Sequence, residues 1–337
     1  MQFFHLAVSA AIAMGGSEGT FPLGELAPTA LAVPDAVLAP ALEPTRGMID
    51  PASPFVSGRA AFSATIDAQP VSFAIRPLLV LPGAHVLIEA PGSTFEYGAG
   101  TLDPRGPGRW SWQAPTQPGV VPLQLTKDDD VIEVVAFVLH PRPQGRVSEL
   151  AGYRIGQYRE TPLRGLDAYR PPEGFIEVRE ADEDILVSPH VTLGEILCKQ
   201  PGDPRFATLT PELLDKLEWV LEEVNAQGHD VGALTIMSGF RTPWYNRSIG
   251  NTTDYSRHLW GDAADVFIDR DGNGRMDDLD GNGRVDVSDA RRLVELVERA
   301  RARGGERFRP GGLSAYRPNA VRGPFVHVDA RGEPARW

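Results

Sequence analysis

Two histidines and one aspartate in the C-terminal part of the chain carry the most specific chemical signal. His258 and Asp265 lie in the segment Ser256-Arg-His-Leu-Trp-Gly-Asp-Ala-Ala-Asp265, and His327 lies in Phe325-Val-His-Val-Asp329. Two imidazoles and one carboxylate form a ligand set that suits Zn²⁺ and leaves a fourth position for water. A water in that position is acidified towards a pKa of about 7, and it could attack a peptide carbonyl that the ion polarises.

The spacing of these residues indicates which elements must position them. His258 and Asp265 are seven residues apart, and on one continuous helix they would be separated by two turns, too far for one ion. Gly261 favours a loop that carries His258, followed by a strand over 263–268 that carries Asp265. His327 lies in another apolar segment, so that neighbouring strands could bring it to the same ion.

Caps and apolar spacing predict the elements that precede the site. Thr192 and Glu195 form a capping box that opens a short helix. A longer helix begins after Thr210, with Pro211 at its first position. A buried strand is expected over 233–237. The long helix has one apolar stripe at helical spacing: Leu213, Leu214, Leu217, Val220, Leu221 and Val224.

Three segments in order give the chain a family likeness over about residues 190–337. Ser238-Gly-Phe-Arg-Thr-Pro243 precedes the S-x-H-x-x-G-x-A-x-D pattern, and F-V-H-V-D follows it. Together they resemble the zinc D-alanyl-D-alanine peptidase superfamily, which includes hedgehog-type domains. The likeness is greatest to murein endopeptidase-type members, which end in F-V-H-V-D followed by R-x-W; the sequence here ends Arg336-Trp337. It implies an α+β zinc peptidase domain with a small antiparallel sheet, which acts on peptidoglycan.

The resemblance also implies roles for two residues near the ligands. Arg241 matches an arginine that holds substrate or stabilises the oxyanion, and a fixed guanidinium beside developing negative charge contributes about 3 kcal/mol. A structural ion pair is the alternative role for Arg241. Ser256 matches a substrate-contacting hydroxyl, and a loop hydrogen bond is its alternative.

The general base is not identified by the family pattern. Many relatives carry Glu or Asp three residues before the last histidine ligand, but Pro324 occupies that position here. Asp329 is two residues after His327, and in a strand it points to the same face. Asp329 is therefore either the base or a partner that orients an imidazole, and both alternatives remain open.

An acidic segment over 269–289 predicts bound calcium. The run from Asp269 to Asp280 matches an EF-hand loop, and an overlapping match runs from Asp278 to Asp289. Because the two frames overlap, we expect at least one Ca²⁺ rather than two independent complete sites; a solvated acidic loop is the alternative. The expected ligands are Asp269, Asp271, Asn273, Asp277 and Asp280 in the first frame, and Asp278, Asp280, Asn282, Asp286 and Asp289 in the second.

The N-terminal half predicts export and a second domain. Residues 1–14 resemble a signal or anchor segment that is too short to span a bilayer, and residues 15–51 have the composition of an Ala/Pro-rich linker. Short strands with turns between them predict an all-β immunoglobulin-like sandwich over 52–143, with strands at 60–66, 71–75, 85–89, 109–113, 121–126 and 131–138. A connector over 144–187 leads to the peptidase domain at 188–337; we expect Tyr153, Tyr158, Tyr169 and Phe175 to anchor the connector.

Composition limits the classes of function. The net charge of −12 argues against nucleic acid as a partner, and no other segment is long and apolar enough for a stable membrane span. The single cysteine, Cys198, excludes an intramolecular disulfide, and we expect it to be buried. The sequence therefore predicts an exported, periplasmic or cell-envelope zinc peptidase that cleaves stem peptides or cross-links containing D-amino acids. Two alternatives remain: an inactive wall-binding protein and a calcium-dependent adhesion module.

Overall fold

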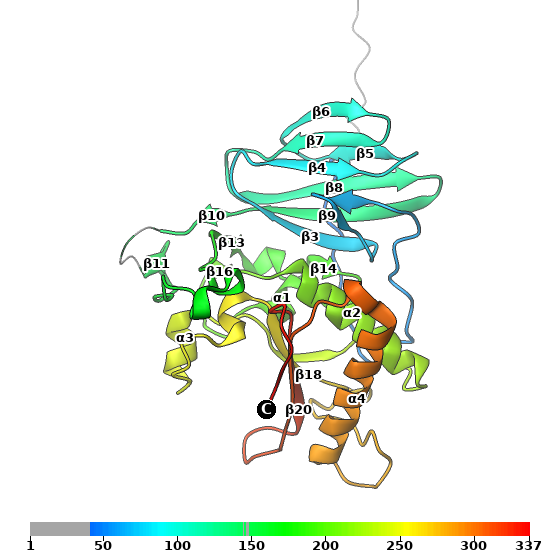
Figure 1. Ribbon diagram of the computed structural model, residues 1–337, viewed down its shortest axis with the longest axis vertical. Coiled ribbons are helices and arrows are strands. Elements are labelled where there is room, and N and C mark those ends of the chain that lie inside the picture. Colours follow the sequence, from blue (N-terminus) through cyan, green and yellow to red (C-terminus); the bar gives the residue numbers. More distant parts are fainter. Residues whose placement is uncertain (1–40, 144, 146–147) are drawn as a thin grey trace, which may run out of the picture. The chain divides into compact units, whose positions relative to one another are not determined.

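The computed structural model describes residues 41–143, 145 and 148–337 (Figure 1). The predicted segment at 1–14 and most of the predicted linker at 15–51 lie outside the described residues. The described part of the linker contacts the rest of the chain, since Arg46 forms an ion pair with Asp184 at 2.6 Å. No helix in the described part of the chain is both long and apolar enough to cross a membrane.

Two sheets face each other in the region 52–143 and share one core. One has the order β2-β1-β4-β7-β6 and the other the order β3-β9-β8-β5. Ile88 and Trp112 from the first sheet and Leu123 and Val134 from the second belong to the same buried cluster. The strands are β1 (Thr65–Ile66), β2 (Gln69–Pro70), β3 (Ile75–Val80), β4 (His85–Glu89), β5 (Thr94–Tyr97), β6 (Thr101–Gly106), β7 (Arg109–Gln113), β8 (Gly119–Lys127) and β9 (Asp130–Val138).

Four of the six strands predicted here are confirmed, at β4, β7, β8 and β9. The prediction over 60–66 is right only for its last two residues, and the strand predicted over 71–75 instead begins at Ile75. Strands β5 and β6 were not predicted: β5 has only four residues, β6 contains proline and glycine, and neither strand contains a buried residue. The immunoglobulin-like relationship of this sandwich stays a prediction.

The segment between the sandwich and the long helix is made of short elements that bury aromatic rings. Tyr153, Tyr158, Tyr169 and Phe175 all lie in the larger buried core, as predicted. The elements are β10 (His140–Pro141), β11 (Glu149–Leu150), β12 (Tyr153–Arg154), η1 (Leu163–Gly165), η2 (Asp167–Tyr169), β13 (Gly174–Val178), η3 (Glu180–Asp182), β14 (Leu186–Ser188), β15 (Val191–Thr192) and β16 (Arg205–Ala207).

The predicted helices are confirmed. Thr192 and Glu195 form a capping box at α1 (Leu193–Ile196), and α2 (Pro211–Ala226) begins at the proline that the sequence indicated. The apolar stripe of α2 is buried, as is the thiol of Cys198. The remaining helices are α3 (Pro243–Ser248), η4 (Arg257–Trp260), α4 (Val287–Gly304) and η5 (Gly305–Arg307).

A five-stranded sheet carries the candidate site. Its order is β17-β18-β20-β19-β21, and all neighbouring strands are antiparallel except β19 and β21. Helix α4 packs on β19 and β20, while α2 packs on α4. The strands are β17 (Thr235–Ser238), β18 (Ala263–Phe267), β19 (Gly312–Tyr316), β20 (Phe325–Asp329) and β21 (Ala335–Arg336). This agrees with the small antiparallel sheet that was predicted for a peptidase domain.

The sandwich and the C-terminal region share buried contacts. Phe73 and Phe137 of the sandwich belong to the same core as α2. Arg76 on β3 forms an ion pair of 2.6 Å with Asp215 on α2, and both side chains are largely buried. The predicted domain division stays a prediction, but the two regions contribute to one continuous core.

Candidate metal centre

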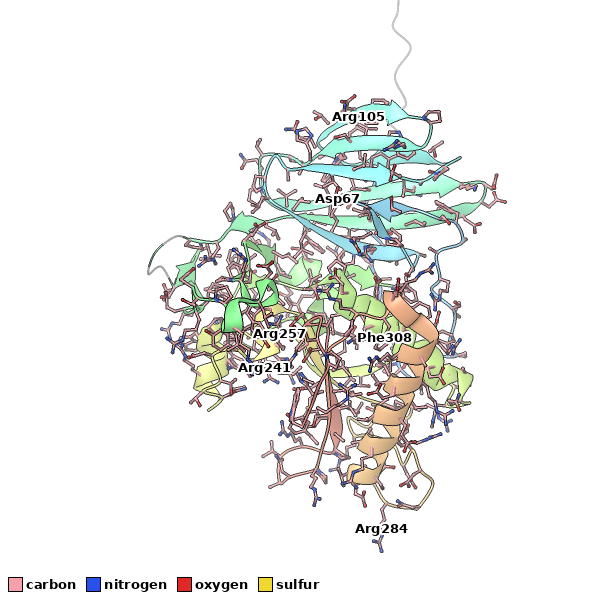
Figure 2. All side chains as sticks on the ribbon, in the orientation of Figure 1. Asp67, Arg105, Arg241, Arg257, Arg284 and Phe308 are labelled. Carbon is pink, nitrogen blue, oxygen red and sulfur yellow. The ribbon has the colours of Figure 1, made fainter. Side chains whose placement is uncertain are left out.

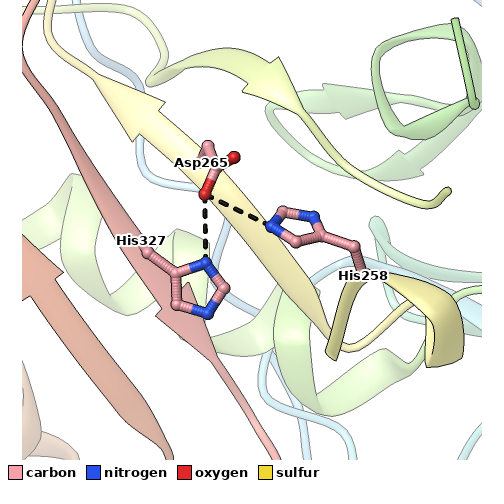
Figure 3. A group of neighbouring side chains, drawn as sticks. All are labelled: His258, Asp265 and His327. Atoms are coloured by element: carbon pink, nitrogen blue, oxygen red, sulfur yellow. Dashed lines mark hydrogen bonds and ion pairs between the residues drawn. The ribbon is translucent and has the colours of Figure 1, made fainter. Parts of the chain in front are cut away.

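The three predicted zinc ligands come together from three elements of the C-terminal region (Figure 3). His258 lies on the 3₁₀ helix η4, which Gly261 ends at a φ of 67°, and Asp265 lies on β18. His327 lies on β20, directly opposite Asp265 in the antiparallel register. All three side chains are buried, so the protein holds their directions firmly.

The spacing of the ligand atoms fits a tetrahedral ion. Oδ1 of Asp265 lies 3.3 Å from Nε2 of His258 and 3.0 Å from Nδ1 of His327. All three ligand atoms lie within 4.8 Å of one another. Ligands about 2.1 Å from a tetrahedral Zn²⁺ are separated by about 3.4 Å, so small adjustments would admit the ion.

The remaining ring nitrogens select the tautomers that a metal requires. Nδ1 of His258 lies 2.7 Å from the main-chain oxygen of Gly239, and a proton on Nδ1 leaves Nε2 with a free lone pair. Nε2 of His327 lies 3.3 Å from Oδ2 of Asp329, so a proton on Nε2 leaves Nδ1 free. These two acceptors can hold the ring protons, so that in these tautomers both imidazoles present an unprotonated nitrogen towards Asp265, as metal coordination demands.

Asp329 lies behind His327 rather than in the open part of the site. Its carboxylate is completely buried, and it accepts hydrogen bonds from the main-chain N–H of Gly312 at 2.8 Å and from Nε of Arg331 at 2.9 Å. Burial raises the pKa of Asp329, but His327 and Arg331 outweigh that effect and hold the pKa below its ordinary value. This geometry is that of a carboxylate that orients an imidazole.

The electrostatics favour the metal-binding protonation state at His258 and Asp265; at His327 burial lowers the pKa, but Asp265 and Asp329 outweigh it and raise the pKa above its ordinary value. Burial lowers the pKa of His258, which favours the neutral imidazole. Burial alone would raise the pKa of Asp265, but His258 and His327 outweigh it and hold that pKa below its ordinary value. An ionised Asp265 beside a neutral His258 is the state that binds a divalent cation.

Arg241 is bound to the metal-ligand carboxylate itself. Its Nη2 donates to Oδ2 of Asp265 at 2.7 Å, and its Nε donates to the hydroxyl of Ser238 at 2.9 Å. The structural ion pair that was the alternative role for Arg241 is therefore present. Because Arg241 also lines the hollow above the site, this contact does not exclude a role towards substrate.

A hollow of about 430 Å³ opens onto the three ligands. Ser256 lines it, and its hydroxyl makes no capping hydrogen bond to η4. Among the described residues, Asp265 is the only one in the lining with an acidic side chain, and Pro324 is not part of the lining. The described residues around the hollow thus offer no acidic general base. The lining consists of Arg241, Asn251, Thr253, Tyr255, Ser256, Arg257, His258, Asp265, Tyr316, Arg322, Phe325, His327, Arg331 and Trp337.

Arg331 and Trp337 are site residues to which the sequence assigned no role. The rings of Trp337 and His327 lie 5.3 Å apart, and the indole N–H donates to the hydroxyl of Tyr316 at 2.7 Å. The signal for Arg331 was present, because it is two residues after Asp329 and alternation places both on one side of the chain. The sequence signal for Trp337 is the Arg336-Trp337 ending, set against the R-x-W of the murein endopeptidase-type members.

The acidic segment forms two separate groups of carboxylates. Asp269, Asp271 and Asp277 lie together in one, and Asp278, Asp280 and Asp289 lie together in the other. Asp280, expected as the last ligand of the first loop, thus belongs to the second group, because the chain turns again at Gly281.

Asn273, Asn282 and Asp286, also expected to bind calcium, have other contacts here. The amides of Asn273 and Asn282 donate to Asp271 and Asp280, respectively, and Asp286 caps α4 by accepting from the N–H of Ser288 at 2.7 Å. Asp289 completes the capping box at the same helix end.

Comparison with known families supports the resemblance for part of the chain. Residues 189–278 match a family model described as Peptidase M15, a zinc D-Ala-D-Ala peptidase-type family. The match includes His258 and Asp265 and ends before His327. No curated protein and no solved structure matches the chain. The resemblance to the zinc D-alanyl-D-alanine peptidase superfamily is confirmed by this family match.

Proposed function

We propose that this chain, part of which matches the Peptidase M15 family, is a zinc peptidase that hydrolyses peptidoglycan stem peptides or cross-links containing D-amino acids. The observation that carries the proposal is the meeting of His258, Asp265 and His327, with both imidazoles presenting a free nitrogen to the shared carboxylate. A purely structural cluster has no need for two imidazoles whose tautomers are set in this way.

Each residue near the centre has a defined task in this proposal. His258, Asp265 and His327 would hold Zn²⁺, which supplies an acidified water and polarises the scissile carbonyl. Arg241 fixes Asp265 and places positive charge at the edge of the hollow, where negative charge develops on the carbonyl oxygen. Asp329 holds the ring of His327 in place.

One observation favours a second candidate, an inactive wall-binding protein. The part of the chain that the structure describes places no acidic side chain in the hollow apart from Asp265, so it offers no second carboxylate there to take a proton from the water. Binding of the same peptides without turnover is the behaviour that this alternative predicts.

Mass spectrometry of muropeptide digests distinguishes the two candidates. We expect the zinc-loaded protein to release cleaved peptides, and the mass of the products identifies the bond. His258→Ala should abolish cleavage, whereas His85→Ala, on an exposed residue of the sandwich, should not alter it. Intact muropeptides after incubation over a range of pH and zinc concentrations would favour the binding protein.

The proposal also covers the cellular location of the protein, the role of the sandwich and the role of calcium. We place the protein in the cell envelope, where its substrate lies, with the immunoglobulin-like sandwich as a spacer or wall-contact module. Calcium at one or both carboxylate groups would stiffen the segment that follows β18. A calcium-dependent adhesion role for the sandwich would require wall attachment that persists when His258→Ala removes hydrolysis.

A further inference from the structure

A second, larger hollow adjoins the one above the metal centre. It measures about 1090 Å³, and Arg241 and Arg322 line both hollows, so the two are continuous along these side chains. We call the larger hollow the lateral groove. One of its walls is the β19–β20 loop from Pro318 to Pro324, and another is the segment from Asn273 to Met276 in the first acidic loop.

None of the described residues that line the lateral groove is acidic, although the chain has 45 Asp and Glu residues and a net charge of −12. Its charged lining residues are all cations: Lys199, Arg241, Arg275 and Arg322. A groove of one sign of charge in a protein of the opposite sign concentrates ligands that carry the protein's own sign.

Three of these cations form no ion pair within the described part of the chain. Arg241 is neutralised by Asp265, but Lys199, Arg275 and Arg322 are exposed and form no ion pair with any described residue. Arg322 packs over the ring of Phe325 at 4.5 Å, which directs the guanidinium without neutralising it. The groove thus has three free positive charges along its walls.

In the first acidic loop, the negative side chains cluster together, apart from the positive side chain of Arg275. The carboxylates of Asp269, Asp271 and Asp277 converge on one another, while Arg275 lines the groove. Its counterpart in the second loop, Arg284, stands in the same Gly-Asn-Gly-Arg sequence but lines neither hollow. Figure 2 shows Arg284 at the tip of that loop, well away from Arg241.

We propose that the lateral groove binds an acidic peptide segment that extends from the metal centre, and that Lys199, Arg275 and Arg322 recognise its free carboxylates. The inference rests on the proposed peptidase function and specifies its substrate class: an extended peptide with ionised carboxylates beyond the scissile bond. Met237 and Phe267, which also line the groove, provide apolar contact for the aliphatic parts of such a peptide.

The test compares two forms of one synthetic stem peptide, the first with its side carboxyl groups free and the second with them converted to amides. Binding is measured calorimetrically with His258→Ala, so that no turnover occurs, and KM is measured with the zinc-loaded protein. We expect the carboxylate form to bind at least tenfold more tightly, with an advantage that shrinks as salt rises.

Charge-reversal variants assign the effect to residues. Lys199→Glu, Arg275→Glu and Arg322→Glu should each weaken binding of the carboxylate peptide about fivefold to tenfold and leave the amidated peptide almost unchanged. Arg284→Glu changes the net charge equally and should have no effect on either peptide. Unfolding temperatures close to that of the unmodified protein establish that the variants are folded.

Equal affinity for the two peptides, or three reversals that behave like Arg284→Glu, would overturn the proposal. The results also distinguish failure of the groove proposal from failure of the peptidase proposal. Charge-selective binding without cleavage keeps the groove and rejects the peptidase, whereas cleavage that ignores peptide charge keeps the peptidase and rejects the groove.

Discussion

Oδ2 of Asp329 lies 3.3 Å from Nε2 of His327, on the side of the ring opposite the nitrogen that faces Asp265. The sequence placed both residues on one face of a strand, and their order along β20 confirms that placement. This contact supports the orienting role of Asp329 over the alternative of a general base, because Asp329 is buried and already bound by Arg331.

Substitution of Asp329 tests that role. Asp329→Asn should lower zinc affinity about 10- to 100-fold, because the amide no longer holds the protonated Nε2 of His327 with a charged acceptor. Competition with a zinc-binding dye measures the effect. Asp262→Asn, which also removes a buried, arginine-paired carboxylate, should leave zinc affinity much less changed. Unchanged zinc affinity in Asp329→Asn would contradict an orienting role.

The contribution of Arg241 can be separated from its ion pair. Arg241→Ala should reduce kcat about 100- to 1000-fold if the guanidinium stabilises the oxyanion, with a smaller loss of zinc affinity. Ser238→Ala keeps the guanidinium and removes only its 2.9 Å hydrogen bond, so we expect a milder loss of kcat. If zinc affinity falls as steeply as kcat in Arg241→Ala, the arginine acts only by holding Asp265.

Lys216 should make the free energy of unfolding depend on pH in the alkaline range. Burial lowers the pKa of this lysine to about 8, and its Nζ donates to the main-chain oxygen of Asp329. In the unfolded chain the pKa returns to 10.5. Between these values the unfolded chain binds more protons, so the free energy of unfolding should rise with pH, by about 3 kcal/mol in total.

Urea denaturation at pH 7.5, 8.5 and 9.5 measures this rise. Lys216→Met should flatten the dependence, and Lys199→Met, at an exposed position, serves as the control. A free energy of unfolding that falls steadily across this range in the unmodified protein would show that Lys216 is not desolvated as described.

The twin acidic loops offer a matched test for calcium. Asp271 and Asp280 occupy equivalent exposed positions before Gly-Asn-Gly-Arg, so their substitution by alanine should not disturb the core. Saturating Ca²⁺ at about 100 times its Kd should stabilise the unmodified protein by about 2.7 kcal/mol for each site.

Asp271→Ala should remove the gain from the first loop, and Asp280→Ala that from the second, as read from the unfolding temperature with and without Ca²⁺. A variant that keeps the full stabilisation by Ca²⁺ identifies a loop that does not bind Ca²⁺. No shift in the unmodified protein would leave both groups as solvated acidic loops.

The sequence was sufficient where local patterns dominate. The proline at the start of α2 and its apolar stripe predicted that helix, and ordered motifs identified the three residues that converge. The side of His327 on which Asp329 acts depends on ring orientation, which spacing along the chain does not determine. The lateral groove is assembled from residues 199, 275 and 322, which no local pattern connects. Strands β5 and β6 were missed because neither contains a buried residue, so they lack the apolar face by which a strand is predicted.

Asp265 on β18 pairs directly with His327 on β20, so the affinity for zinc depends on the correct alignment of these two strands. A slip of one residue between β18 and β20 would turn His327 to the opposite face of the sheet and remove one of the three ligands. Zinc would then bind tightly only to molecules whose strands have aligned correctly. Zinc binding would thus stabilise the native strand register relative to misaligned registers, even in the absence of substrate.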